Sequence, residues 1–98
     1  MRYDKLRVIM KVLVLYQPDS EHATTVEAFV RDIERQYAMG GKIELVSVDT
    51  REGAETANLY GVWSFPTIIA IRDNGEMLNM WEGEPLPLMD EITAYANA

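Results

Sequence analysis

The chain of 98 residues is long enough for one domain, and its 48% hydrophobic and 26% charged residues are typical of a soluble globular protein. Nine basic and sixteen acidic residues leave a formal net charge of −7. This excess of negative charge argues against nucleic acid as a partner, because nucleic-acid binding requires a cationic face, and it argues equally against docking on anionic lipid.

The chain contains no cysteine and a single histidine, His22. Without thiols, these 98 residues can form no disulfide, thiolate zinc site, cysteine-ligated iron–sulfur cluster or cysteine nucleophile. The single histidine excludes a metal site built on several imidazoles, and no carboxylates stand at calcium-loop spacing. We therefore expect no cofactor and no metal.

Residues 1–9 precede the first apolar run and are interpreted as an N-terminal extension or a short leading strand, followed by one domain over residues 10–98. Lys11 interrupts the apolar run and no small-residue cleavage site follows, so the start does not match a secretory signal. No stretch approaches the ~20 apolar residues of a transmembrane helix. We expect a cytoplasmic chain with no membrane partner.

The hydrophobic pattern alternates between strand and helix. A continuous apolar run within residues 11–16 predicts a strand buried on both faces, and apolar residues at helical spacing predict an amphipathic helix over residues 20–38. That helix can begin at Ser20 or at a second capping box formed by Thr24 and Glu27. The predicted elements are strands over residues 11–16, 42–49, 67–72 and 76–82 and helices over residues 20–38, 50–60 and 88–96.

The resulting order is β-α-β-α-β-β-α, which predicts an α/β fold with a mixed four-stranded sheet and helices on both faces. A βαβ unit gives a parallel pair of strands, and the turn Asp73-Asn74-Gly75 gives an antiparallel hairpin whose last strand lies at an edge. Met77, Met80 and Trp81 are expected to pack under the last helix. The residues expected to face inward from the helices are Ala23, Val26, Phe29, Val30, Ile33, Tyr37, Ala54, Ala57, Tyr60, Leu88, Ile92 and Tyr95.

Residues 61–67 read Gly-Val-Trp-Ser-Phe-Pro-Thr, and together with this element order they resemble the thioredoxin family. The resemblance covers about residues 10 to 98. It implies a thioredoxin-like fold in which the bond before Pro66 is cis. It also places the position of the family's Cys-x-x-Cys motif on the four residues Ser20, Glu21, His22 and Ala23.

The chain departs from the family at the residues that carry redox chemistry. Both cysteines of the motif are absent, and the position of the buried acid that assists proton transfer in thioredoxins is occupied by Val14. The position of the tryptophan before the motif is occupied by Asp19. Because thiol–disulfide exchange needs a thiolate, we expect a redox-inactive member and no oxidoreductase activity. An engineered cysteine-less variant of an oxidoreductase remains an alternative.

Two chemical interpretations of the motif position compete with simpler structural ones. Ser20 with His22 as base would form a nucleophilic pair, but nothing nominates a third group to orient the base, so a helix N-cap is favoured. His22 with Asp19 and Glu21 would form a metal site. Consecutive residues at a helix start point in different directions, so a solvated acidic first turn is favoured instead.

Aromatic residues and prolines gather around the predicted cis-proline. A peptide or protein client is expected in a groove formed by Tyr16, Pro18, Trp63, Phe65 and Pro66. A cis bond would leave the Phe65 backbone free to pair with an extended peptide, and exposed apolar residues in that position usually mark a contact site. The alternative is a structural scaffold that uses the same patch for homo-oligomerisation, so the chain is either a monomer or a homodimer. Whether Phe65 instead packs inward stays open.

Overall fold

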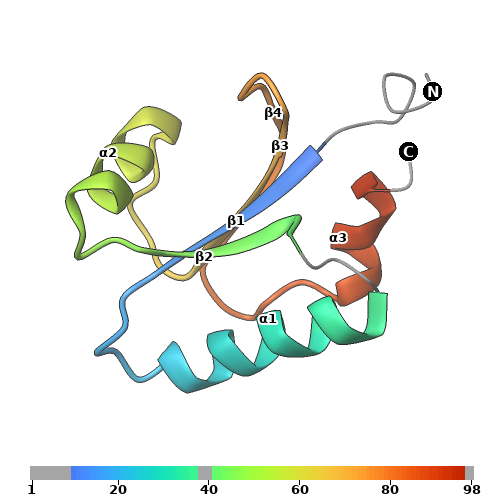
Figure 1. Ribbon diagram of the computed structural model, residues 1–98. Helices are drawn as coiled ribbons and strands as arrows, with labels where there is room; N and C mark the ends of the chain where they lie inside the picture. The colour runs from blue at the N-terminus through green and yellow to red at the C-terminus, as the bar shows by residue number, and fades with distance from the viewer. Residues whose placement is uncertain (1–9, 38–40, 97–98) are drawn as a thin grey trace.

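The computed structural model describes residues 10–37 and 41–96, so the interpretation of residues 1–9 lies outside the described residues (Figure 1). The elements are β1 (Met10–Tyr16), α1 (Ala23–Tyr37), β2 (Ile43–Ser47), α2 (Arg51–Tyr60), β3 (Thr67–Arg72), β4 (Met77–Glu82) and α3 (Met89–Ala96). The strands form one sheet in the order β2-β1-β3-β4, with β1 parallel to β2 and antiparallel to β3. The predicted element order and mixed sheet are confirmed.

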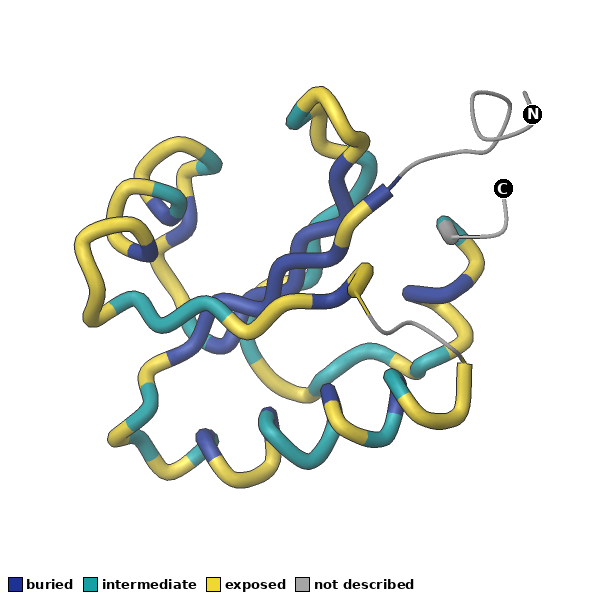
Figure 2. Tube along the Cα trace, in the orientation of Figure 1, coloured by how far each residue is buried: buried dark blue, intermediate teal, exposed yellow. Residues whose placement is uncertain are grey.

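β1 lies between two other strands, and all but one of its side chains are buried, as its apolar run predicts (Figure 2). Because successive side chains of a strand point to opposite faces, Val12 and Val14 pack toward α1 and α3, and Leu13 and Leu15 pack toward α2. Only Lys11 is exposed, and its Nζ lies 3.1 Å from the Glu44 carboxylate on β2. The centre of the sheet is therefore covered by helices on both faces.

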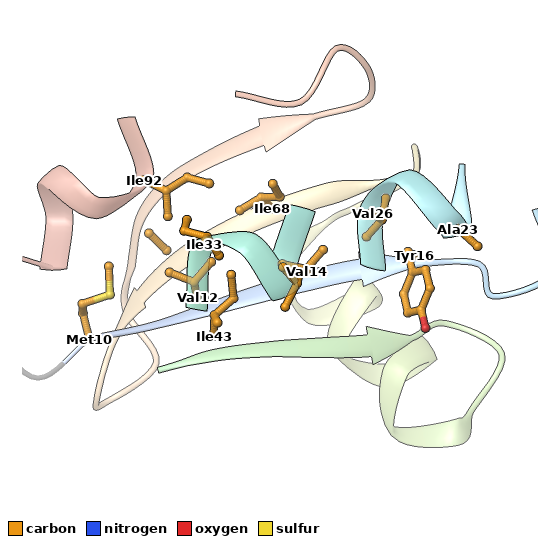
Figure 3. Close-up of a cluster of buried hydrophobic side chains, with 12 residues drawn as sticks. Met10, Val12, Val14, Tyr16, Ala23, Val26, Ile33, Ile43, Ile68 and Ile92 are labelled. Atoms are coloured by element: carbon orange, nitrogen blue, oxygen red, sulfur yellow. The ribbon is translucent and has the colours of Figure 1, made fainter. Parts of the chain in front are cut away.

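The larger hydrophobic cluster fills the space between the sheet and the two helices α1 and α3 (Figure 3). The buried stripe of α1 is formed by Ala23, Val26, Val30 and Ile33, spaced at three or four residues. Phe29 is only partly buried. Tyr37 was predicted to face inward but is 38% exposed, because its hydroxyl reaches across to donate a 2.8 Å hydrogen bond to the Asp90 carboxylate on α3.

α2 packs against the opposite face through its backbone as much as through its side chains. A Cβ added at Gly53 would lie 1.8 Å from the carbonyl oxygen of Ser47, so the helix and the end of β2 are in direct backbone contact. Gly53 and Ala57 face the sheet, whereas Ala54, predicted to face inward, is exposed. The helix begins at the N-cap Thr50, which accepts from the Gly53 N–H at 2.9 Å, and ends at Gly61 with a φ of 68°.

Three further inward-facing assignments are wrong at the C-terminal end. Leu88 lies before α3 and is 71% exposed, because the Glu91 carboxylate accepts from its N–H at 2.9 Å and holds it in the capping position. Met77 is 47% exposed, and Met80 packs with the α2 cluster. Trp81 does lie against α3, with its ring 5.8 Å from that of Tyr95; neighbouring residues of a strand face opposite ways, so Met80 cannot join it.

The outer strands are short and end in turns. β4 lies at an edge, as predicted, and β2 forms the other edge. β2 is shorter than the predicted strand over residues 42–49 because the chain turns after Ser47, whose carbonyl oxygen accepts from the Thr50 N–H at 3.2 Å. None of the helices in the described part of the chain is long and apolar enough to cross a bilayer.

Candidate docking surface

Three loops meet at the end of the sheet where β1 finishes and β3 begins. Leu15 pairs with Thr67, so the chain after β1 lies opposite the chain before β3. Thr67 also pairs with Glu82, and the Gly83 N–H donates to the Pro66 carbonyl oxygen at 2.7 Å. The sheet thus brings residues 17–22, 63–66 and 83–84 to one edge of the molecule. We call the surface of these three segments the loop surface.

The segment 17–22 is closed on itself by hydrogen bonds to Gln17. The Ser20 hydroxyl donates to the Gln17 carbonyl oxygen at 2.6 Å, and the Gln17 N–H donates to His22 Nε2 at 3.4 Å. The predicted N-cap role of Ser20 is therefore wrong: its hydroxyl is a donor in a turn, and α1 begins three residues later, at Ala23. Nor does the Ser20 hydroxyl bond to His22, so the geometry does not form a nucleophile–base pair.

The predicted capping box of Thr24 and Glu27 is not formed either. Thr24 lies inside α1 rather than at its start, and the Glu27 carboxylate accepts a hydrogen bond from Tyr16 instead of closing a capping box. The predicted acidic first turn is wrong as well: Asp19 and Glu21 are exposed but precede α1, whose first turn contains no acidic residue. His22 is half-buried. Across the described residues, no three His, Asp or Glu side chains are grouped so that they could hold a metal ion.

The segment 63–66 presents a large aromatic side chain and free backbone groups. Trp63 is 79% exposed, the highest value among the large hydrophobic residues that the structure exposes. The Phe65–Pro66 peptide bond is cis, and Pro66 is fully buried. The Phe65 side chain is half-buried against the α2 cluster, and its backbone N–H and C=O have no hydrogen-bond partner among the residues that the structure describes.

Tyr16 does not belong to an exposed patch. Its side chain is 8% exposed, packs in the larger cluster and donates a 3.1 Å hydrogen bond to the Glu27 carboxylate. Pro18 is half-buried. Of the five residues predicted to form the groove, Trp63 alone has a largely exposed side chain. Tyr16 is buried because β1 continues through it and its side chain packs under α1.

Burial and the Glu27 carboxylate both raise the pKa of the Tyr16 hydroxyl above its usual value near 10. A raised pKa in the folded state means that the folded protein holds the phenol proton more tightly than the unfolded chain does. The contribution of Tyr16 to the free energy of unfolding is therefore fully present below pH 10 and is lost as the pH rises beyond it. We expect Tyr16→Phe to cost about 1 kcal/mol at neutral pH and to weaken this alkaline loss. Urea unfolding at neutral and alkaline pH tests both effects; an unchanged alkaline loss would contradict the assignment to Tyr16.

The hollow at this end of the molecule involves a residue that the sequence analysis did not single out. It encloses about 410 Å³ and is lined by Ser20, Glu21, His22, Thr25 and Glu84. Glu84 comes from the segment after β4, and the Glu84–Pro85 bond is also cis. In the sequence, Glu82 and Gly83 at the end of the last predicted strand indicate a turn, but no pattern indicates that this turn lies beside residues 20–22. A second hollow of about 530 Å³ lies between β2 and α2.

Comparisons with known proteins agree with this architecture. Thioredoxin of Bacillus subtilis is 37% identical to the chain over 60 residues, which make up 60% of this chain and 57% of that protein. The match thus spans little more than half the length of the curated relative. No protein-family model matches the chain.

Solved thioredoxin structures superpose on nearly the whole chain. The germline-specific thioredoxin Deadhead of Drosophila melanogaster aligns with a TM-score of 0.64 at 24% identity, over 95% of this chain and 83% of that one. Thioredoxin-2 of the malaria parasite aligns with a TM-score of 0.65 at 24% identity, over 89% and 81%. These likenesses, at 24% identity, establish the fold. The chain has a thioredoxin-like fold, and 60 of its residues are similar in sequence to a bacterial thioredoxin.

This thioredoxin-like chain carries no cysteine, and thiol–disulfide exchange requires an attacking thiolate. At the position of the buried acid implied by the resemblance, Val14 is fully buried in the larger hydrophobic cluster. The described loop surface therefore offers hydrogen-bonding backbone, an exposed indole and carboxylates, but no redox group.

Proposed function

We propose that this thioredoxin-like domain binds an extended peptide or protein segment on the loop surface without performing redox chemistry. The observation that carries the proposal is the segment 63–66, where Trp63 is 79% exposed and the N–H and C=O of Phe65, two residues later, have no hydrogen-bond partner among the described residues. A strand-like segment of a partner can pair with such backbone groups, as peptides do at exposed sheet edges. Trp63 would then anchor one of its side chains.

The exposure of Trp63 supports this proposal on energetic grounds. Tryptophan is highly buried on average in folded proteins, and leaving it in water forgoes a large hydrophobic contribution. Tryptophan is also among the residues that most often dominate binding energy at protein interfaces. The loop that carries the indole is anchored three residues later, where the Gly83 N–H donates to the Pro66 carbonyl oxygen, and this favours that role.

The proposal predicts that the protein has no disulfide-reductase activity. In an insulin-reduction assay with dithiothreitol, the turbidity rate should equal that of the protein-free control, because the chain has no thiolate that could attack the insulin disulfides. Introducing Ser20→Cys and Ala23→Cys together should give only a weak oxidoreductase, since Val14 cannot relay a proton. A protein-dependent rate from the cysteine-free chain would refute redox inactivity.

The binding proposal itself is tested by selection from a displayed library of random short peptides, carried out in parallel on the wild-type chain and on Trp63→Ala. We expect peptides that are enriched by the wild-type chain and lost on the variant. If no peptide is enriched, or if both proteins enrich the same peptides equally, the loop surface is not a peptide site.

A homodimer through the same surface is the competing proposal, and sedimentation distinguishes the two. A binding module should sediment as a monomer at micromolar concentration, whereas a scaffold should sediment as a dimer that Trp63→Ala dissociates. The exposed Trp63 is compatible with both outcomes.

A further inference from the structure

Several carboxylates lie exposed around the loop surface. The exposed acidic residues at this end of the sheet are Asp19, Glu21, Asp49, Glu82 and Glu84, and none of the five forms an ion pair within the described residues. Away from the loop surface the carboxylates are mixed. Asp32, Glu44, Glu55 and Glu76 each contact an arginine or lysine, whereas Glu34, Glu52, Asp73 and Glu91 form no ion pair among the described residues. The negative charge at this end of the sheet is thus not neutralised by an ion pair among the described residues.

Basic residues are absent from the segments that build this surface. The sequence has no lysine or arginine over residues 12–30, 52–71 or 73–98, which include all three loops. Lys11, Lys42 and Arg72 lie at the opposite end of the sheet, at the start of β1, before β2 and at the end of β3. Arg51 begins α2 at the near end, but its Nε lies 3.9 Å from the Glu55 carboxylate. The basic residues at the strand ends, Lys11, Lys42 and Arg72, thus lie away from the loop surface.

The 410 Å³ hollow adds a shape to this charge distribution. Glu21 and Glu84 line it from two different loops, and its other lining residues, Ser20, His22 and Thr25, are polar. An open, polar hollow of this kind does not suit an apolar side chain. It suits an ammonium or guanidinium group, which needs several oxygen acceptors and favours carboxylates.

We propose that the partner segment is cationic: an extended peptide that places an apolar residue against Trp63 and lysine or arginine side chains against the carboxylates of the loop surface, one of them in the hollow between Glu21 and Glu84. This inference rests on the proposed function and specifies its partner. A second copy of the chain is a poor occupant, because a symmetric dimer would press the two sets of carboxylates against each other. A partner of opposite charge gains from the same carboxylates in both encounter rate and specificity.

The peptide selection tests this inference when the charge of the selected peptides is recorded. Peptides enriched on the wild-type chain but not on Trp63→Ala should carry more lysine and arginine than the input library. A triple variant, Glu21→Gln, Glu82→Gln and Glu84→Gln, should bind these peptides about tenfold more weakly at low salt, and the difference should shrink at high salt. The matched control, Asp32→Asn, Glu44→Gln and Glu76→Gln, changes the net charge equally at distant sites and should bind as the wild type does.

The possible outcomes separate this inference from the proposed function. Enriched peptides that depend on Trp63 but show no excess of basic residues would overturn the cationic partner and leave the peptide site standing. Equal weakening by the triple variant and its control would also overturn it, because the attraction would then follow net charge rather than the loop surface. The absence of any Trp63-dependent peptide would overturn both proposals.

Discussion

Replacing Trp63 by alanine is expected to weaken the binding of a selected peptide by more than about tenfold while leaving the fold intact. Aromatic anchors at interfaces typically contribute ~2 kcal/mol or more, which corresponds to a loss of about 30-fold in affinity. Because Trp63 is 79% exposed, its removal should change the free energy of unfolding by less than about 0.5 kcal/mol. Isothermal titration and urea unfolding of the same two proteins measure both quantities.

Met77→Ala is the matched control for this prediction. Met77 is also a partly exposed apolar residue, at 47%, but it begins β4 at the opposite end of the sheet from the loop surface. Its replacement should leave peptide affinity unchanged. An equal loss of affinity in both variants would show that binding is non-specific hydrophobic association, and a large loss of stability in Trp63→Ala would contradict the exposed position of the indole.

Gly53→Ala is expected to be strongly destabilising, even though alanine is the better helix former. Its Cβ would lie 1.8 Å from the Ser47 carbonyl oxygen, so α2 must move away from the end of β2. The gain in helix propensity is about 1 kcal/mol, whereas forcing extra volume into a close contact costs ~3 kcal/mol or more when the obstacle is backbone. The clash should win, and the urea midpoint should fall clearly.

Gly61→Ala separates this clash from the ordinary cost of losing a glycine. Gly61 has a φ of 68° and no atom within 4 Å of an added Cβ, so only the left-handed backbone conformation opposes the change, at about 1 kcal/mol. Gly53→Ala should cost clearly more than this. A stabilising or neutral Gly53→Ala would show that α2 does not approach β2 as closely as described.

The architecture was predictable because the patterns that encode it are local. The apolar run of β1 predicts a central strand, the spacing of Val26, Val30 and Ile33 predicts an amphipathic helix, and Asp73-Asn74-Gly75 predicts a hairpin turn. In the structure, the hairpin turn closes with the Gly75 N–H donating to the Arg72 carbonyl oxygen at 2.9 Å, and Gly75 has a φ of 93°. Each pattern reports on the residues that it contains.

The predictions that were wrong or missing concern residues whose positions depend on contacts between distant segments. The burial of Tyr16 follows from its bond to Glu27 and from α1 lying over the strand end. Gly53, rather than Ala54, faces the sheet because backbone contact with Ser47 fixes the rotation of α2, and helical spacing alone does not distinguish the two. Glu84 lines the hollow beside α1 only because β4 pairs with β3 and returns the chain to this end. These positions depend on tertiary contacts, which local sequence patterns do not encode.

The central claim is that a peptide binds on the loop surface, and its most direct test is a ¹H–¹⁵N correlation spectrum recorded as a selected peptide is added. We predict that the Trp63 indole N–H, the Phe65 amide and the amides of residues 19–22 shift together and saturate at one peptide concentration. Shifts confined to the other hollow, at residues such as Leu45 and Thr56 between β2 and α2, with Trp63 and Phe65 unmoved, would contradict the account.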